Sequence, residues 1–250
     1  MSTLSFTRIF QILTFGVCVV ILAGCGGGDE YKKSPLDELI RDLPTNEVYS
    51  IILYDMDVQG NFFESYFHKY KIVKGSDPEK ITEEETDWKE VSEREFKNHV
   101  NDMGMEIAAR DSTGKLTKNV TPPGYSNYVG NKRYGYWNNS GSGNSFWVFY
   151  GQYAFMSSMF RMATYPAYYS HYNDWRGNYY GAGRPYYGPT SSGSSYYGTN
   201  SSYNRSTNPS STWSRNTSSF KNRVASRTTR SSSNRTSSSS SRSRGGSSGK

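Results

Sequence analysis

The stretch that decides the fold is Glu47–Asp57, with the sequence EVYSIILYDMD, in which apolar residues follow one another almost without interruption. A short apolar run of this kind is typical of a β-strand that is covered on both faces. Gln59-Gly60-Asn61 then supplies a turn, and Phe62–Val73 alternates so that Tyr66 and Tyr70 share one face. The two runs therefore predict a β-hairpin.

Two short helices are expected to flank this hairpin. Ser34-Pro35-Leu36-Asp37-Glu38 combines an N-cap serine, a proline at the first helical position and acidic residues in the first turn, and this helix should end near Leu43-Pro44. Ser92-Glu93-Arg94-Glu95 is a capping box, which predicts a second helix that runs to about Met103 and is ended by Gly104.

A further strand is expected over Met105–Arg110, and residues 76–90 hold a short strand at best, around Trp88. The acidic run Glu83-Glu84-Glu85 is interpreted as a solvated charged face or as a patch that docks a partner. We therefore expect an α+β fold over residues 34–120, in which a small antiparallel sheet packs with two short helices. A domain of this length can bury one modest core.

Residues 121–189 are expected to form a connector rich in tyrosine and glycine, which begins at the break Thr121-Pro122-Pro123-Gly124. Its most apolar segment, residues 146–163, places Met156 and Phe160 on one side of a helical wheel and predicts an additional amphipathic helix. Polar residues within the segment argue against a membrane-spanning helix. It would either pack on the core or lie in the plane of a bilayer.

The C-terminal tail, residues 190–250, is rich in Ser, Thr, Asn and Arg. Such a composition buries too little apolar surface to offset the entropy of ordering, so a long disordered tail is expected. No acidic residue follows Asp174, whereas twelve Lys and Arg residues do, in a chain of formal net charge +7. The tail cations that are candidates for contact with anions are Arg205, Arg215, Lys221, Arg223, Arg227, Arg230, Arg235, Arg242 and Arg244.

The N-terminal segment, residues 1–24, has the features of a secretory signal peptide. Arg8 precedes an apolar run from Ile9 to Leu22, and small residues stand before Cys25. The run is shorter than the roughly 20 apolar residues that a comfortable transmembrane helix needs.

The sequence Leu22-Ala23-Gly24-Cys25 resembles the lipobox of bacterial lipoproteins. The resemblance implies cleavage before Cys25, acylation of its thiol, and anchoring of the mature chain in membrane lipid, with residues 25–33 as a flexible tether. Gly26 rather than aspartate follows the cysteine, which implies the outer membrane in a Gram-negative host. In another host the expected location is the outer face of the cytoplasmic membrane.

The expected partners of the basic tail are an anionic envelope polymer or lipid head groups, because each cation near an anionic surface is worth about 1 kcal/mol. A tail that only solubilises the protein is the alternative. Ser241-Arg242-Ser243-Arg244 is similar to the Arg/Ser segments of RNA-processing proteins. Nucleic acid is nevertheless not expected as a partner, since an exported lipoprotein does not meet messenger RNA.

Catalytic and metal chemistry is not expected. Cys18 would be removed with the signal peptide and Cys25 would carry lipid, so the mature chain would have no free thiol for a disulfide or a metal. His68, His99 and His171 lack the spacing of metal ligands, and no cofactor is expected. No serine of the folded part stands in a nucleophile elbow.

The sequence therefore indicates a membrane-anchored envelope lipoprotein with a non-enzymatic binding or scaffolding role. Two alternatives remain open. The first is an enzyme or enzyme accessory that acts on envelope polymers through the carboxylates of Asp55, Asp57 and Glu64. The second is a subunit of a membrane complex that docks through the helix predicted over residues 146–163.

Overall fold

The computed structural model describes residues 33–60, 64–139, 144–191, 193–216, 218–222, 224 and 226. The chain divides into two units, Met1–Lys32 and Lys33–Lys250, and every described residue belongs to the second. The predicted signal peptide and the lipobox with Cys25 lie outside the described residues. So do the tail cations Arg223, Arg227, Arg230, Arg235, Arg242 and Arg244.

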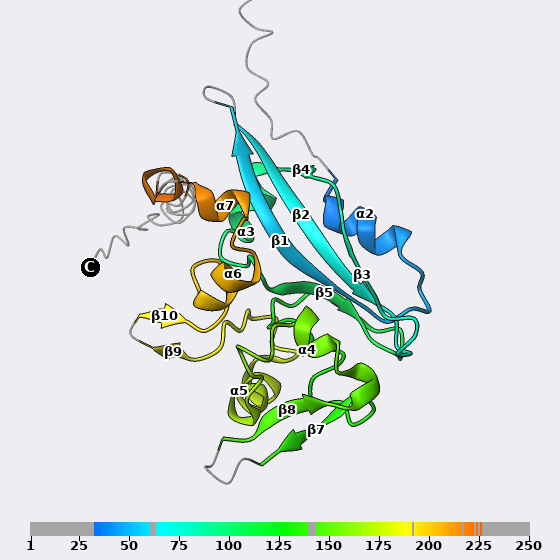
Figure 1. Cartoon of the computed structure of the whole chain (residues 1–250). Coiled ribbons are helices and arrows are strands. Elements are labelled where there is room, and N and C mark those ends of the chain that lie inside the picture. The colour runs from blue at the N-terminus through cyan, green and yellow to red at the C-terminus, as the bar shows by residue number, and fades with distance from the viewer. Residues whose placement is uncertain are drawn as a thin grey trace, which may run out of the picture. The chain divides into compact units, whose positions relative to one another are not determined.

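The described residues contain a six-stranded antiparallel sheet in the order β3-β2-β1-β5-β6, with β4 also paired to β2 (Figure 1). Its strands are β1 (Tyr49–Gln59), β2 (Ser65–Lys74), β3 (Thr82–Glu85), β4 (Lys89–Val91), β5 (Glu106–Arg110) and β6 (Leu116–Thr117). β1 and β2 pair from Tyr49 opposite Lys74 to Gln59 opposite Ser65, so the predicted hairpin is confirmed. Together with several short helices, this sheet confirms the α+β class.

A register shift between Leu53 and Asp55 determines which side chains of β1 enter each core. Ile51 and Leu53 precede the shift and Met56 follows it, yet all three belong to the same hydrophobic cluster. Ile52, on the other face of the strand, belongs to a second cluster. β1 is therefore covered on both faces, as its apolar run predicts, and the bulge keeps the first cluster continuous along the strand.

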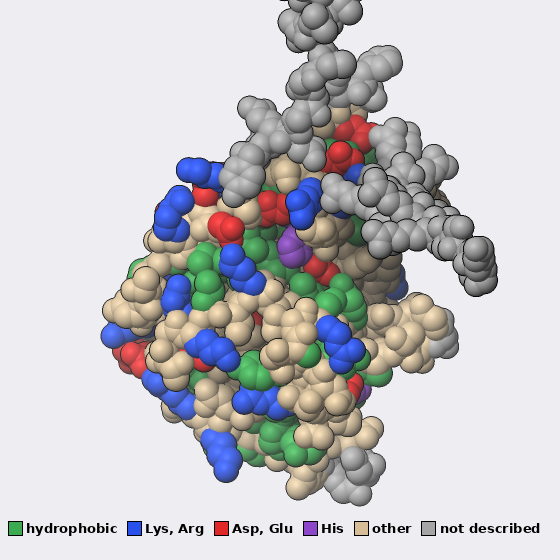
Figure 2. Space-filling model, turned by 180° about the vertical axis from the view of Figure 1, so that it is seen from behind, with side chains coloured by type: hydrophobic (Ala, Val, Ile, Leu, Met, Phe, Trp, Pro, Cys, Tyr) green, Lys and Arg blue, Asp and Glu red, His purple; other side chains and the backbone are tan. Residues whose placement is uncertain are grey.

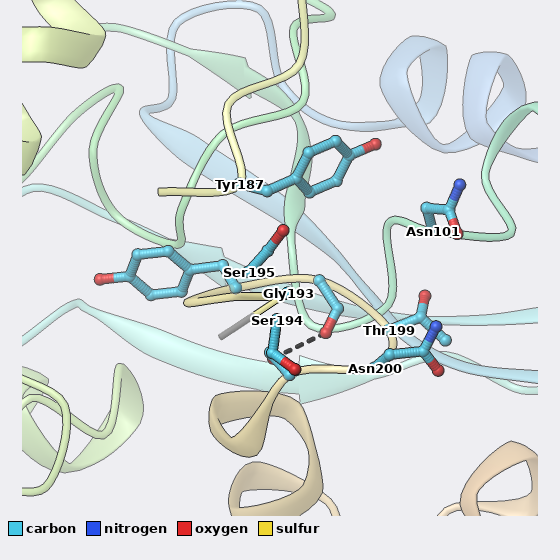
Figure 3. A pocket seen from close by; sticks show the side chains of 10 residues that line it. Asn101, Tyr187, Gly193, Ser194, Ser195, Thr199 and Asn200 are labelled. Carbon is cyan, nitrogen blue, oxygen red and sulfur yellow. Dashed lines mark hydrogen bonds between the residues drawn. The ribbon is translucent and has the colours of Figure 1, made fainter. Parts of the chain in front are cut away.

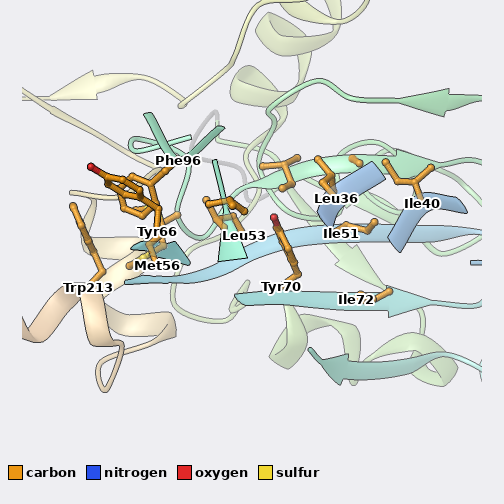
Figure 4. Packing of buried hydrophobic residues seen from close by; sticks show 14 of the residues in the cluster. Leu36, Ile40, Ile51, Leu53, Met56, Tyr66, Tyr70, Ile72, Phe96 and Trp213 are labelled. Atoms are coloured by element: carbon orange, nitrogen blue, oxygen red, sulfur yellow. The ribbon is translucent and has the colours of Figure 1, made fainter. Parts of the chain in front are cut away.

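The first hydrophobic cluster joins the sheet to three short helices: α2 (Pro35–Asp42), α3 (Glu93–Asn98) and α7 (Thr212–Arg215). The helix predicted to begin after Ser34 is confirmed as α2, and Leu36 and Ile40 pack from it at one end of the cluster (Figure 4). Phe96 and Trp213 meet at the other end, with ring centroids 5.8 Å apart.

α3 begins where its capping box predicts but ends earlier, at Asn98. Ser92 caps it by accepting a hydrogen bond from the backbone N–H of Glu95. Gly104 follows with φ +79°, and its N–H donates to the carbonyl of Leu53 in β1 at 2.7 Å. The chain has to leave the helix to make this bond, which leads it directly into β5.

The single amphipathic helix predicted over residues 146–163 is wrong. This segment forms β8 (Phe146–Phe149), the turn η1 (Gly151–Tyr153) and α4 (Met156–Met159), and β8 pairs with β7 (Gly135–Asn138). Trp147 and Phe149 are buried, whereas the residues between and before them are partly exposed. That alternation has the two-residue period of a strand. A helical wheel drawn over all of residues 146–163 does not reveal it.

The second hydrophobic cluster covers the other face of the sheet with aromatic residues. Val48, Ile52 and Val73 contribute to it from the sheet side, and Met156 and Phe160 from the segment that was predicted to be helical. Residues 146–163 therefore pack on the core, which was one of the two placements expected for them. The same layer includes α5 (Tyr169–Asp174) and the π-helical turn η2 (Trp175–Tyr179).

The prediction of disorder from residue 190 onward is wrong for residues 193–216. They follow β9 (Thr190–Ser191) and form β10 (Ser194–Ser195), α6 (Ser202–Thr207) and α7. Ser201 and Ser211 cap the two helices through their side chains, and Tyr203 and Trp213 are buried. Each helix thus brings one large aromatic residue into the core, which offsets the cost of ordering a polar segment. Residues 227–250 lie outside the described residues.

Candidate functional site: a tyrosine-lined cavity

The three carboxylates proposed for catalysis serve the fold. Asp55 is buried and accepts hydrogen bonds from the backbone N–H groups of Thr212, at 2.7 Å, and Trp213, at 3.2 Å. Burial raises the pKa of the Asp55 carboxyl, and these backbone donors offset part of the rise. Asp57 accepts from the N–H of Val58, next to it in the chain.

Glu64 accepts from the hydroxyl of Tyr66 at 2.9 Å. Neither Glu64 nor Asp55 nor Asp57 lines any of the cavities described below. None of the cavities formed by the described residues considered below therefore brings these carboxylates together.

The acidic run of β3 is paired across the sheet. Glu83 contacts Lys71, Glu84 contacts Lys74 at 2.8 Å, and Glu85 contacts Lys69 at 2.7 Å. In the register of the two strands only Glu85 stands directly opposite a lysine, Lys71, so these three ion pairs run diagonally between β2 and β3 and leave the edge with paired opposite charges. The pairing favours the expectation of a charged face over that of an acidic patch.

The tail cations that the structure describes lie on its ordered part. Arg205 is exposed and donates to the carbonyl of Asn200 and to the hydroxyl of Ser202. Lys221 donates to the carbonyl of Ser214 at 3.1 Å, and partial burial lowers its pKa. Arg215 is exposed at the end of α7. Two of these three described cations therefore bind backbone carbonyls of their own segment.

One aromatic cluster is built around Trp175 of η2. Its ring centroid lies 5.6 Å from that of Tyr125, 5.4 Å from Tyr172 and 5.1 Å from Tyr180. Trp175 and Tyr125 are buried, whereas Tyr172 and Tyr180 are partly exposed. The partly exposed rings form a wall of the cavity described next.

A cavity of about 230 Å³ opens beside this cluster. Its aromatic lining comes from Tyr125, Tyr134, Tyr172 and Tyr180, and its polar lining from Asp111, Ser112, Ser126, Asn127, Asn131 and Arg176. Asp111 directly follows β5, the asparagines lie in the turns after Gly124, and Arg176 belongs to η2. Segments that are far apart in the sequence thus meet at one site.

Asn127 fixes the floor of the cavity to the sheet. Its Nδ2 donates to the carbonyl of Tyr49 at 2.9 Å, to that of Arg110 at 3.2 Å and to the hydroxyl of Ser50 at 3.3 Å. Its side chain is buried, and its Oδ1 has no hydrogen-bond partner in the described part of the chain. The floor is therefore held rigidly by β1 and β5.

Gly130 allows Tyr172 to form the wall. It adopts φ +76°, and a Cβ atom at this position would lie 2.4 Å from the ring of Tyr172. A contact that short is not tolerated between carbon atoms, so only glycine permits the close approach. This glycine is a feature of the site that the sequence did not single out.

Two cations contact the same tyrosine at the cavity. The guanidinium of Arg176 lies 4.1 Å from the ring centroid of Tyr180, and Lys115 Nζ lies 5.3 Å from it. Among the described residues, no carboxylate forms a salt bridge with either cation. By contrast, Arg133 beside Tyr134 is paired with Asp77 at 2.9 Å.

A second cavity, of about 290 Å³, lies between the residues after α3 and the segment 193–201 (Figure 3). Small neutral side chains surround it, including Ser194, Ser195 and Asn200. Thr199 accepts a hydrogen bond from the N–H of Met103 at 3.0 Å and donates to a backbone carbonyl at 2.7 Å. These contacts attach the C-terminal segment to the rest of the fold.

A histidine–aspartate pair lies next to this cavity. His99 Nδ1 is 2.8 Å from Asp102 Oδ2, and the hydroxyl of Tyr187 donates to Asp102 Oδ1 at 2.6 Å. The carboxylate of Asp102 is almost fully buried. The sequence reasoning missed this pair, although a spacing of three residues at a helix end could have indicated it. The rings of His68 and His99 do meet, with centroids 6.1 Å apart.

Large exposed aromatic side chains are spread over several elements: Trp88, Tyr136, Tyr150, Phe155 and Tyr169. On the face shown in Figure 2, hydrophobic side chains lie between polar and basic ones rather than in one continuous patch. Among the described residues, no group of three or more His, Cys, Asp and Glu side chains is arranged to hold a metal ion. The helices within the described ranges are all too short or too polar to cross a bilayer.

Comparison of the chain with protein-family models, with curated proteins and with solved structures gives no match.

Proposed function

We propose that the protein is a lipid-anchored binding protein of the bacterial cell envelope, without catalytic activity of its own. The single observation that carries the proposal is the sequence Leu22-Ala23-Gly24-Cys25 at the end of an apolar signal segment. Acyl chains on Cys25 would hold the folded unit at a membrane surface, since two or more chains give stable anchoring.

The folded unit supports a binding role rather than a catalytic one. The carboxylates of Asp55 and Asp57 are engaged by backbone N–H groups, so their hydrogen bonds stabilise the fold. The tyrosine-lined cavity places two partly exposed rings, Tyr172 and Tyr180, beside several polar side chains, an arrangement suited to a polar ligand.

The anchor is tested by Cys25→Ser. We expect this variant to lose palmitate labelling and to leave the membrane fraction after a high-salt wash. Cys18→Ser is the matched control, because Cys18 lies within the signal segment that is removed. Retained labelling of the Cys25→Ser protein would remove the basis of the proposal.

One observation favours the alternative of an enzyme that acts on envelope polymers. A histidine oriented by a buried aspartate, as His99 is by Asp102, is the arrangement of a general base and its positioning partner. Incubating the protein with an envelope glycan fraction and measuring new reducing ends tests this. Product that His99→Gln abolishes and His171→Gln leaves unchanged would establish the enzyme, and absence of product supports the binding role.

A further inference from the structure

The cavity beside Trp175 is the right size for one ring-shaped ligand unit. Its volume of about 230 Å³ is below the roughly 300–1,000 Å³ of pockets that enclose drug-sized ligands. Only one unit of an extended molecule would enter, and the remainder would lie outside. An end or a single residue of a polymer fits this description.

The walls favour a ligand with flat hydrocarbon faces and hydroxyl groups. The partly exposed Tyr172 and Tyr180 offer aromatic rings, which pack against C–H groups such as those on the faces of a pyranose ring. Asp111 accepts from Thr113 and Lys115 through Oδ1. Its Oδ2 accepts no hydrogen bond from the described residues and is available to a ligand hydroxyl. This combination of rings and hydrogen-bonding groups is suited to a sugar.

The charge at the mouth favours a sugar that bears an anion. Arg176 is stacked on Tyr180 and has no carboxylate partner among the described residues. A guanidinium stacked by its face keeps its N–H edges free for bidentate contact with an oxyanion. Asp111 lines the same cavity and would repel a doubly charged phosphate more strongly than a singly charged carboxylate.

We propose that this cavity binds one carboxylate-bearing sugar unit of an envelope glycan, with Arg176 contacting the carboxylate and the tyrosine rings packing on the sugar. The envelope source of the glycan rests on the proposed function, whereas the chemistry of the ligand rests on the cavity alone. The anchor and the sugar site can therefore fail independently.

The test uses the full-length mature chain in detergent and a pair of matched tetrasaccharides. In the first, glucuronate alternates with N-acetylglucosamine, and in the second the carboxylates are reduced to alcohols. Calorimetric titration should give saturable binding of the acidic form and at least about tenfold weaker binding of the reduced form, as expected for loss of a charge-assisted hydrogen bond.

Arg176→Gln should weaken binding of the acidic tetrasaccharide by the same factor and leave binding of the reduced form unchanged. Arg184→Gln is the matched control, because Arg184 also stacks on a tyrosine, Tyr179 at 4.9 Å, but does not line the cavity. Absence of saturable binding, equal affinity for both forms, or an equal effect of both substitutions would overturn the inference. Membrane release by Cys25→Ser alongside any of these results would leave the proposed anchor standing.

Discussion

Asp55 in β1 accepts a 2.7 Å hydrogen bond from the backbone N–H of Thr212, a residue 157 positions further along the chain. The same carboxylate accepts from the N–H of Trp213, so it satisfies two first-turn N–H groups of α7, while Ser211 accepts from that of Ser214. Trp213 then fills the cluster around Phe96. A segment with the composition of a disordered tail is thereby attached to the centre of the sheet.

This attachment predicts the effect of Asp55→Ala. Removing the carboxylate leaves the backbone N–H groups of Met56, Thr212 and Trp213 without this acceptor, so the free energy of unfolding should fall by about 1–3 kcal/mol. Urea unfolding measures the loss, and limited proteolysis should cut the segment around Trp213 faster. Asp57→Ala is the control, because the Asp57 carboxylate bonds only within its own strand, to Val58 and Gln59. Equal losses for the two variants would contradict the role of Asp55.

The sequence predicts the parts of the fold that depend on local pattern. Alternation and a glycine turn specify the β1–β2 hairpin, and Ser92 with Glu95 specifies the start of α3. The strand β8 was missed because Trp147 and Phe149 alternate over only four residues before the chain turns at Gly151. So short a period-two signal is lost in a helical wheel over a longer segment.

The sequence does not predict the site, because its residues come from separate segments. Asp111, Asn127 and Tyr172 belong to different elements, and only the second hydrophobic cluster and the bonds of Asn127 to β1 bring them together. The polar composition of residues 193–216 also led to the wrong prediction that they are disordered. Their three buried aromatic residues, Tyr197, Tyr203 and Trp213, are too few to register in an average over the tail.

Glu106 predicts stability that falls as the pH rises. The residue lies fully buried in β5, and burial raises its pKa from 4.5 to about 7, although donors such as the N–H of Gly124 oppose the rise. Between these values the folded protein holds a proton that the unfolded chain has released. The contribution of Glu106 to the unfolding free energy therefore decreases with pH in this window, by roughly 3 kcal/mol in total for the two pKa values of 4.5 and about 7.

Glu106→Gln should remove this contribution, so its unfolding free energy relative to that of the wild type should be higher at pH 8 than at pH 4.5. Urea titrations at closely spaced pH values measure the slope. Glu84→Gln is the control, because Glu84 is exposed and pairs with Lys74 at the surface of the sheet. An unchanged slope in Glu106→Gln would show that the carboxyl is not held protonated by the fold.

The burial of His68 predicts the opposite pH dependence, a contribution to stability that rises with pH. Its ring is fully buried between Tyr70 and Phe96, and burial, with a smaller effect of His99, lowers its pKa from 6.5 to about 3. Below pH 6.5 the unfolded chain takes up a proton that the folded protein refuses. The stabilisation is therefore complete above pH 6.5 and is lost as the pH falls toward 3.

Between pH 4.5 and 6.5 the contributions of His68 and Glu106 have opposite signs and should nearly cancel in the wild type. His68→Leu should then expose a decrease of stability with pH, and Glu106→Gln an increase, each approaching about 1.4 kcal/mol per pH unit. Slopes of the same sign in the two variants would contradict these assignments.

The described fold extends well beyond residue 190, so a test of the basic tail has to use a shorter deletion. Deleting residues 190–250 would remove Trp213 and Tyr203 from the core, so any loss of binding would reflect unfolding. Deleting residues 227–250 removes six cations and leaves the described fold intact. In a Cys25→Ser background, we expect the longer chain to be retained on envelope fractions at low salt and released by salt.

The shorter chain should lose this retention by more than about tenfold, because each cation near an anionic surface contributes about 1 kcal/mol. Replacing Arg205 and Arg215 with glutamine in the untruncated chain is the control, since both lie on the ordered segment and Arg205 already binds the carbonyl of Asn200. Equal retention of the two chains at every salt concentration would mean that residues 227–250 act only as a spacer.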